Sequence, residues 1–286
     1  TTACAGENTR DSVSSYIYTF LGLEKAGSSS LPTPPELPVR PPVLCAGCPH
    51  RASFYAVKKA MKGQKTIFCG DIGCYTLGNA MPLDMVDTCL CMGAGLNIAQ
   101  GVEKVEPDTT CFAFVGDSTF FASAITGVVN AVYNQANMVL VVLDNSTTAM
   151  TGHQPHPGTG RTVMGEIVQK INIEQVLRGI GVTEVETVNP LELEASVLCV
   201  QKMAKKPGVK AIIFKSPCIA VTRPDAPLHV NPDNCIGCKK CILELGCPSI
   251  VLDQGKVCID SSMCTGCGLC SQVCPVHAIT GGASHE

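Results

Sequence analysis

Phe114-Val-Gly116-Asp117-Ser118 ends one apolar run of the sequence, and Leu143-Asp144-Asn145 ends the next, with a helical pattern between them. A strand, a helix and a second strand in this order predict a βαβ unit. A glycine-containing turn that opens a helix offers backbone N–H groups to a phosphate. A Mg²⁺ ion beside that phosphate needs hard oxygen ligands. The pattern therefore predicts a phosphate and Mg²⁺ site, and an ordinary turn with a capping aspartate is the alternative.

The same alternation extends over residues 45–225. Apolar, β-branched runs predict strands at 65–69, 110–115, 138–143, 181–188 and 209–214. Helical patterns lie at 50–62, 93–104, 120–134, 173–179 and 190–205. Such alternation predicts an α/β fold with a mostly parallel sheet. We expect three parts: an N-terminal segment with a proline-rich linker (1–40, with an amphipathic stretch over 13–23 and a Gly-Ser run at 27–30), the α/β domain (41–225), and a small cysteine-rich domain (226–286).

The composition excludes several classes of protein. The chain has 286 residues, of which 45% are hydrophobic and 16% charged, so it can bury a core and is not disordered. A net charge of −3 shows no excess of basic residues that would favour binding to nucleic acid or an anionic membrane. No apolar run approaches the roughly 20 residues that span a bilayer, and no secretion signal opens the chain. The chain begins at Thr1, which suggests a trimmed leader or a piece of a longer polypeptide.

Cysteine is the outlier of the composition. The chain has 19 cysteines, many in Cys-x-x-Cys pairs, and the odd count argues against a secreted disulfide scaffold. In intracellular proteins, cysteines at such spacings are typical of metal ligands. We therefore expect a cytoplasmic protein.

The C-terminal part repeats a cysteine pattern. Each run places three cysteines on a tight loop and a fourth, followed by proline, farther on. In two-cluster ferredoxins the fourth cysteine of each run binds the other cluster. This rule assigns one [4Fe–4S] cluster to Cys235, Cys238, Cys241 and Cys274, and a second to Cys264, Cys267, Cys270 and Cys247. The first run departs from the pattern, with five residues rather than three before Cys247. Two structural zinc knuckles are the alternative.

The strand–helix–strand unit resembles the diphosphate-binding motif of thiamine diphosphate (TPP) enzymes, which starts Gly-Asp-Gly and ends in Asn. The resemblance implies that Gly116 and Ser118 lie against the cofactor. It also implies that the Asp117 carboxylate, the Asn145 amide oxygen and the Thr147 carbonyl bind Mg²⁺. Ser118 replaces the last glycine of the motif.

Together these motifs resemble the 2-oxoacid:ferredoxin oxidoreductases, which join TPP chemistry to iron–sulfur clusters. The family's cluster beside TPP implies a third [4Fe–4S] site at Cys45, Cys48, Cys74 and Cys218. Cys69 competes with Cys74 but lies in an apolar strand pattern, and four unrelated buried thiols are the alternative.

Within the family the chain is most similar to the α subunits of indolepyruvate:ferredoxin oxidoreductases. The resemblance covers about residues 40–280 and is carried by residues 40–51, 87–93, 116–121 and 144–158. Because the Cys89-x-Cys91 pair lies just before the start of a helical pattern, we expect Cys91, Met92 and Gly93 to line the cofactor site and do not take Cys89 as a ligand. His153 and His156 either contact the cofactor or substrate or belong to an ordinary loop.

The family implies oxidative decarboxylation of a 2-oxo acid, an aryl pyruvate such as indolepyruvate, to acyl-CoA and CO₂. The implied partners are coenzyme A, ferredoxin, and another subunit or upstream domains that supply the activating glutamate. No catalytic residue is assigned in this chain. Three alternatives stay open: the same reaction on a different 2-oxo acid, an electron-transfer subunit with a vestigial TPP domain, and a non-oxidative decarboxylase with a structural tail.

Overall fold

A computed structural model describes residues 6–24 and 35–281. The chain forms two compact units, Thr1–Pro41 and Pro42–Glu286. In the first unit, helix α1 (Arg10–Leu21) begins at Thr9, whose side chain accepts a hydrogen bond from the Ser12 N–H, and ends at Gly22. The amphipathic stretch is therefore helical. The Gly-Ser run at 27–30 and the first linker prolines lie outside the described residues.

The second unit is built on a five-stranded parallel sheet with the strand order β1-β2-β3-β5-β4. The strands are β1 (Thr66–Cys69), β2 (Thr110–Gly116), β3 (Met138–Asp144), β4 (Glu184–Val188) and β5 (Val209–Lys215). The central strands are buried along almost their whole length, which explains their continuous apolar runs. The predicted α/β fold class is confirmed.

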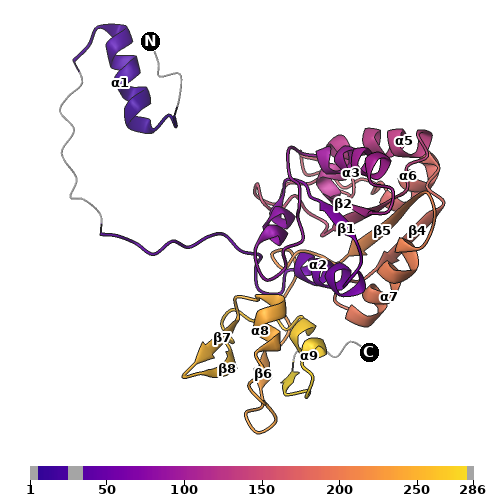
Figure 1. The fold of residues 1–286 in the computed structure, drawn as a ribbon. Coiled ribbons are helices and arrows are strands. Elements are labelled where there is room, and N and C mark those ends of the chain that lie inside the picture. The colour runs from indigo at the N-terminus through magenta and orange to yellow at the C-terminus, as the bar shows by residue number, and fades with distance from the viewer. Residues whose placement is uncertain (1–5, 25–34, 282–286) are drawn as a thin grey trace. The chain divides into compact units, whose positions relative to one another are not determined.

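Helices cover both faces of this sheet (Figure 1). Helices α2 (Pro49–Ala60) and α7 (Leu193–Ala204) pack on one face. Helices α3 (Ala94–Val105), α5 (Ile125–Tyr133) and α6 (Ile173–Ile180) pack on the other. Since side chains alternate along β2, Phe112 and Phe114 enter the first core, and Cys111 and Ala113 enter the second.

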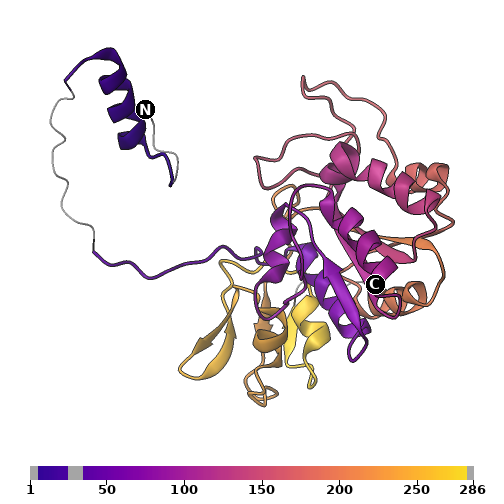
Figure 2. The ribbon, with the colours of Figure 1, turned by 45° about the horizontal axis from the view of Figure 1, so that its top comes forward.

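The carboxyl ends of the parallel strands lie along one edge, where ligands bind in such sheets. After β2, a helical run begins with α4 (Asp117–Thr119) and passes through a π-helical segment, Phe120–Ala124, into α5. It starts three residues earlier than the helix predicted at 120–134, and π segments are frequent at functional sites. A 3₁₀ helix (Cys74–Asn79) follows β1. The connection from β3 to α6 extends from the sheet as long loops (Figure 2).

The cysteine-rich part folds as short elements around two small sheets. Strands β6 (Leu228–Val230) and β9 (Ile279–Gly281) pair, and β7 (Ile250–Asp253) pairs with β8 (Lys256–Ile259). Helices α8 (Lys240–Leu245) and α9 (Leu269–Val273) share one hydrophobic core with α2 and α7. One compact unit thus spans 42–286, and a domain boundary near residue 225 stays a prediction. None of the helices in the described ranges is both long and apolar enough to cross a membrane.

Candidate cofactor and cluster sites

A pocket of about 540 Å³, open to solvent, lies at the carboxyl edge of the sheet. Its lining includes six of the residues expected at the cofactor: Met92, Gly116, Asp117, Ser118, Asn145 and Thr147. In the part of the chain that the structure describes, Cys91 and Gly93 are not among its lining residues. The two strand ends singled out by the sequence therefore meet at one cavity.

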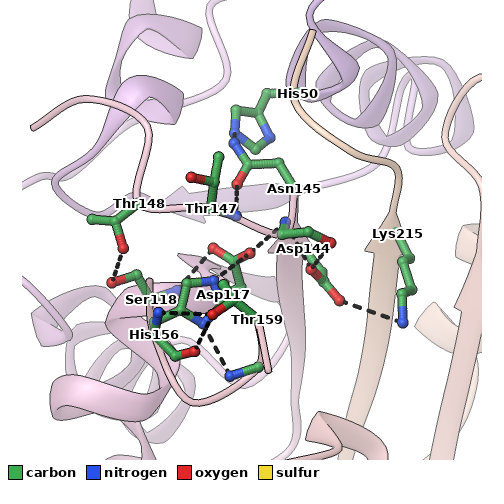
Figure 3. Close-up of polar contacts among 12 residues, drawn as sticks. His50, Asp117, Ser118, Asp144, Asn145, Thr147, Thr148, His156, Thr159 and Lys215 are labelled. Atoms are coloured by element: carbon green, nitrogen blue, oxygen red, sulfur yellow. Dashed lines mark hydrogen bonds and ion pairs between the residues drawn. The ribbon is translucent and has the colours of Figure 1, made fainter. Parts of the chain in front are cut away.

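Asp117 is the most constrained polar group of this pocket. Its side chain is only 4% exposed. One carboxylate oxygen accepts the Ser118 N–H at 2.8 Å, and the other accepts the Ser146 N–H at 2.7 Å (Figure 3). His156 Nε2 lies 3.1 Å from the second oxygen. The carboxylate is thus held by backbone from both strand ends, with the His156 ring beside it.

The side chain of Asn145 is oriented by His50, the second residue of α2. The Asn145 Nδ2 atom lies 3.2 Å from His50 Nε2 (Figure 3). Burial lowers the pKa of His50 to about 4, and the charge of Asp117 acts in the opposite direction. The ring is therefore neutral at physiological pH, and its Nε2 can accept the amide N–H. This orientation turns the Asn145 oxygen away from His50, where it accepts the Thr147 N–H at 3.4 Å and keeps a second lone pair for a metal ion.

A second carboxyl group, Asp144, lies half-buried beside this site, and the sequence motifs gave it no role. Its Oδ1 accepts the Ser146 N–H at 3.1 Å, and Lys215 Nζ lies 3.9 Å from its Oδ2. Burial, followed by the charge of Asp117, raises the pKa of Asp144. Asp144 is not among the described residues that line the pocket, so Asp117 is the carboxylate that, with the Asn145 amide oxygen, forms a donor set that suits Mg²⁺.

The floor of the pocket depends on Asp71 and Tyr75, which carry no motif. Asp71 is 1% exposed and accepts the Gly93 N–H at 2.7 Å and the Tyr75 hydroxyl at 2.9 Å. Burial raises the pKa of Asp71. The Tyr75 ring packs on Gly116, where a Cβ would lie 2.5 Å from ring atom Cε1. Close packing therefore requires glycine at position 116, and Gly93 supports the pocket through Asp71.

Thiols of the expected proximal quartet come together beside this pocket. Cys45 and Cys48 flank the turn before α2, Cys74 opens the 3₁₀ helix, and Cys218 follows β5. Burial raises the pKa of Cys74, and the thiols of Cys218 and Cys45 raise it further. Burial also raises the pKa of Cys48, with a smaller contribution from Cys45. The competing Cys69 is fully buried in β1, in the opposite core with Cys111.

The C-terminal cysteines gather in the two predicted sets. One cavity is lined by Cys235, Cys238, Cys241 and Cys274, the last of which comes from the other sequence run. Burial raises the pKa of Cys270, and the nearby thiols add to the shift. These thiols are, in decreasing order, Cys267, Cys247, Cys264 and the more distant Cys241. The structure thus places Cys274 with the first three cysteines of the other run, and Cys247 near Cys270, as the ferredoxin pattern predicts.

Two structural zinc knuckles stay the alternative for the two C-terminal cysteine sets. Among the described residues, no three His, Cys, Asp or Glu side chains form a group that could hold a single metal ion. The ligand roles of the three cysteine sets stay predictions.

Comparison with known proteins relates these sites to a family. The model of the thiamine pyrophosphate enzymes, C-terminal TPP-binding domain, matches residues 71–213. The chain belongs to the thiamine pyrophosphate enzymes. Its C-terminal part also matches the 4Fe–4S binding domain, over residues 257–280. This thiamine pyrophosphate enzyme thus carries a TPP-binding domain and a ferredoxin-type cluster motif in one chain.

Relatives of this thiamine pyrophosphate enzyme are indolepyruvate oxidoreductase subunits IorA, which confirms the resemblance. The subunit from Methanothermobacter marburgensis is 44% identical over 86% of this chain and 41% of its own length. The subunit from Archaeoglobus fulgidus is 42% identical over 85% of this chain and 40% of its own. The chain therefore spans about two fifths of these relatives. A solved structure, the 2-oxoglutarate:ferredoxin oxidoreductase from Magnetococcus marinus, matches the fold with a TM-score of 0.54 and 20% identity, covering 63% of this chain and 65% of that chain.

Proposed function

We propose that this chain is the part of a 2-oxoacid:ferredoxin oxidoreductase that binds TPP, Mg²⁺ and three [4Fe–4S] clusters. The whole enzyme converts a 2-oxo acid and coenzyme A to acyl-CoA and CO₂ in the cytoplasm and passes the electrons to ferredoxin. One observation carries the proposal: Cys74 lines the pocket that contains Asp117 and Asn145, and it also lies among the proximal thiols. A cofactor in that pocket would be next to an electron acceptor, as oxidative chemistry requires.

The residues of the pocket fit the cofactor by their chemistry. Asp117, the Asn145 amide oxygen and the Thr147 carbonyl would hold Mg²⁺, and the backbone at Gly116 and Ser118 would face the diphosphate. When bound, TPP supplies the stabilisation of negative charge that decarboxylation needs. The protein positions that chemistry, and the neutral ring of His50 keeps the Asn145 oxygen available. This intact ligand set argues against a vestigial TPP domain.

We propose an aryl pyruvate such as indolepyruvate as the substrate, because the relatives named above are indolepyruvate oxidoreductase subunits. A different 2-oxo acid is the alternative, since the solved structure with the same fold has 2-oxoglutarate and coenzyme A bound.

A second protein surface completes the pocket in this proposal. Met92 and Met150 line the pocket and are about half exposed, at 48% and 53%. On the long loops between β3 and α6, Val163, Met164 and Ile167 are each more than three-quarters exposed. Exposed apolar groups on this scale mark an interaction surface. The partner is another subunit or a further domain of the enzyme, and it supplies the activating glutamate.

The experiment combines cofactor analysis with turnover. An anaerobic preparation should contain about twelve irons and one TPP per chain, and about eight irons would remove the proximal cluster from the proposal. The assembled enzyme should reduce ferredoxin or viologen with aryl pyruvates in preference to 2-oxoglutarate. Residues 1–286 alone, with clusters and TPP loaded, should show no such activity. Turnover by this chain unaided would contradict the shared site.

A further inference from the structure

Arg51 is a buried cation that the sequence motifs leave unexplained. It lies in the first turn of α2, three residues after Cys48, and is 4% exposed. Its Nη2 donates to the carbonyl oxygens of Leu44 at 2.6 Å and Cys45 at 3.5 Å. Its Nη1 donates to the carbonyl oxygens of Leu245 at 2.6 Å and Gly246 at 2.9 Å. One guanidinium therefore joins the loop of the proximal cysteines to the segment just before Cys247.

This contact accounts for the irregular spacing of the first ferredoxin run. That run has five residues, Ile242–Gly246, where the second has three. The last two of the five supply the acceptors for Arg51. Gly246 has a left-handed φ of 58°, and a Cβ there would lie 2.4 Å from Pro82 Cδ. The lengthened segment is thus packed against the α/β part of the unit rather than free in solvent.

The two cysteine loops also touch directly. Gly47, between Cys45 and Cys48, has a φ of 71°, and a Cβ there would lie 1.8 Å from Thr265 Oγ1. Thr265 lies between Cys264 and Cys267. The proximal set therefore adjoins the set of Cys247, Cys264, Cys267 and Cys270, and Arg51 lies at their junction.

Arg51 has no carboxylate partner in the part of the chain that the structure describes. None of the ion pairs in residues 6–24 and 35–281 includes Arg51, and its buried Nε–H has no hydrogen-bond partner there. The hydrogen bonds of Arg51 reach both cysteine sets, through the carbonyl of Cys45 and through those of Leu245 and Gly246, which directly precede Cys247. A buried charge without a carboxylate partner is costly, and a negatively charged cluster in each set would offset that cost.

We propose that Arg51 bridges two cluster sites, fixing the Cys45–Cys48 loop against the segment that delivers Cys247 and raising the reduction potentials of both clusters. Reduction adds negative charge to a cluster, and a nearby fixed cation stabilises the reduced form. The Nε–H, which has no partner among the described residues, would be available to a sulfur atom of a bound cluster. Arg51 is a positioning residue that contacts neither substrate nor TPP. The inference rests on the cluster sites of the proposed function.

The test is an EPR-monitored redox titration of the anaerobically reconstituted full chain. In R51Q the reduction potentials of the two adjacent clusters should fall by about 59 mV. For a one-electron couple this is a tenfold decrease in the ratio of reduced to oxidised cluster at a given potential. The cluster at Cys235, Cys238, Cys241 and Cys274 should shift less. R51K keeps the positive charge but loses the planar guanidinium with its several N–H donors. The cluster potentials of R51K should therefore lie between those of the wild type and R51Q.

The matched control removes another buried cation, Lys210, which is 2% exposed in β5 and bonded to Asn137. K210M should leave all three potentials unchanged. Equal potentials in the wild type and R51Q, or the same shift in all three clusters, would overturn the bridge. If R51Q does not load its clusters, the comparison of R51K with the wild type decides, and equal potentials there overturn it. A wild-type chain that fails to load three clusters would instead count against the proposed function.

Discussion

Asp117→Asn removes the charge of the pocket's central carboxylate with almost no change in size. In the wild type each oxygen accepts a backbone N–H, from Ser118 at 2.8 Å and from Ser146 at 2.7 Å. An amide has a single oxygen, so its NH₂ group must face one of these donors. The variant therefore loses one hydrogen bond to a charged acceptor, leaves a buried N–H without a partner, and presents no negative charge to Mg²⁺.

The size of the effect follows from these losses. A hydrogen bond to a charged group contributes about 1.5–3 kcal/mol, and at 4% exposure Asp117 is little screened by solvent. We take about 3 kcal/mol for the loss of TPP–Mg²⁺ affinity, or roughly 100-fold. A ligand at 100 times its Kd stabilises a protein by about 2.7 kcal/mol. At the same concentration the variant would be near its Kd and gain only about 0.4 kcal/mol.

Thermal unfolding with and without TPP and Mg²⁺ measures this difference. The Tm of the wild type should rise by about 5–10 °C, and that of Asp117→Asn by about 1 °C. The matched control is Asp87→Asn, because the exposed Asp87 also accepts a backbone N–H, from Phe68 at 2.7 Å, but does not line the pocket. Asp87→Asn should keep the full shift. An undiminished TPP shift in Asp117→Asn would refute the ligand assignment.

Three further predictions concern one cluster, one helix and one buried charge. Cys218→Ser should remove only the proximal cluster, so that iron falls from about twelve to about eight per chain while the EPR signals of the other clusters persist. Gly95→Ala should destabilise folding by about 3 kcal/mol in denaturant titrations, because the new Cβ would lie 2.3 Å from the Gly70 oxygen. Gly101→Ala in the same helix has open space and should stabilise by about 1 kcal/mol; the same sign for both would contradict the packing. Burial lowers the pKa of Lys210 from 10.5 to about 8, so its charge opposes folding most below pH 8 and ever less up to pH 10.5. Lys210→Met should therefore stabilise by about 2 kcal/mol at pH 7 and by less at pH 10, and an equal gain at both values would argue against a lowered pKa.

The sequence by itself determined the sheet and the family. The segments that form β2 and β3 are apolar throughout because central parallel strands are buried on both faces. Each strand can therefore be predicted from a few consecutive residues. The turn that begins at Gly116 can also be predicted from its own residues. Cysteine spacing predicted which thiols gather at the C-terminal end, since the spacing itself sets how a loop wraps around a cluster.

Only the tertiary structure decided what lies around those motifs. His50 reaches Asn145 from a helix 95 positions earlier, and Arg51 meets Leu245 across 194 positions. Asp71 supports the pocket without any motif of its own. Such contacts join residues distant in the chain, and the consequences of burial, such as a neutral His50 and an unpaired Arg51, arise only when other segments cover these side chains. No local sequence pattern shows which segment will cover a given side chain, because the packing of the whole unit decides this.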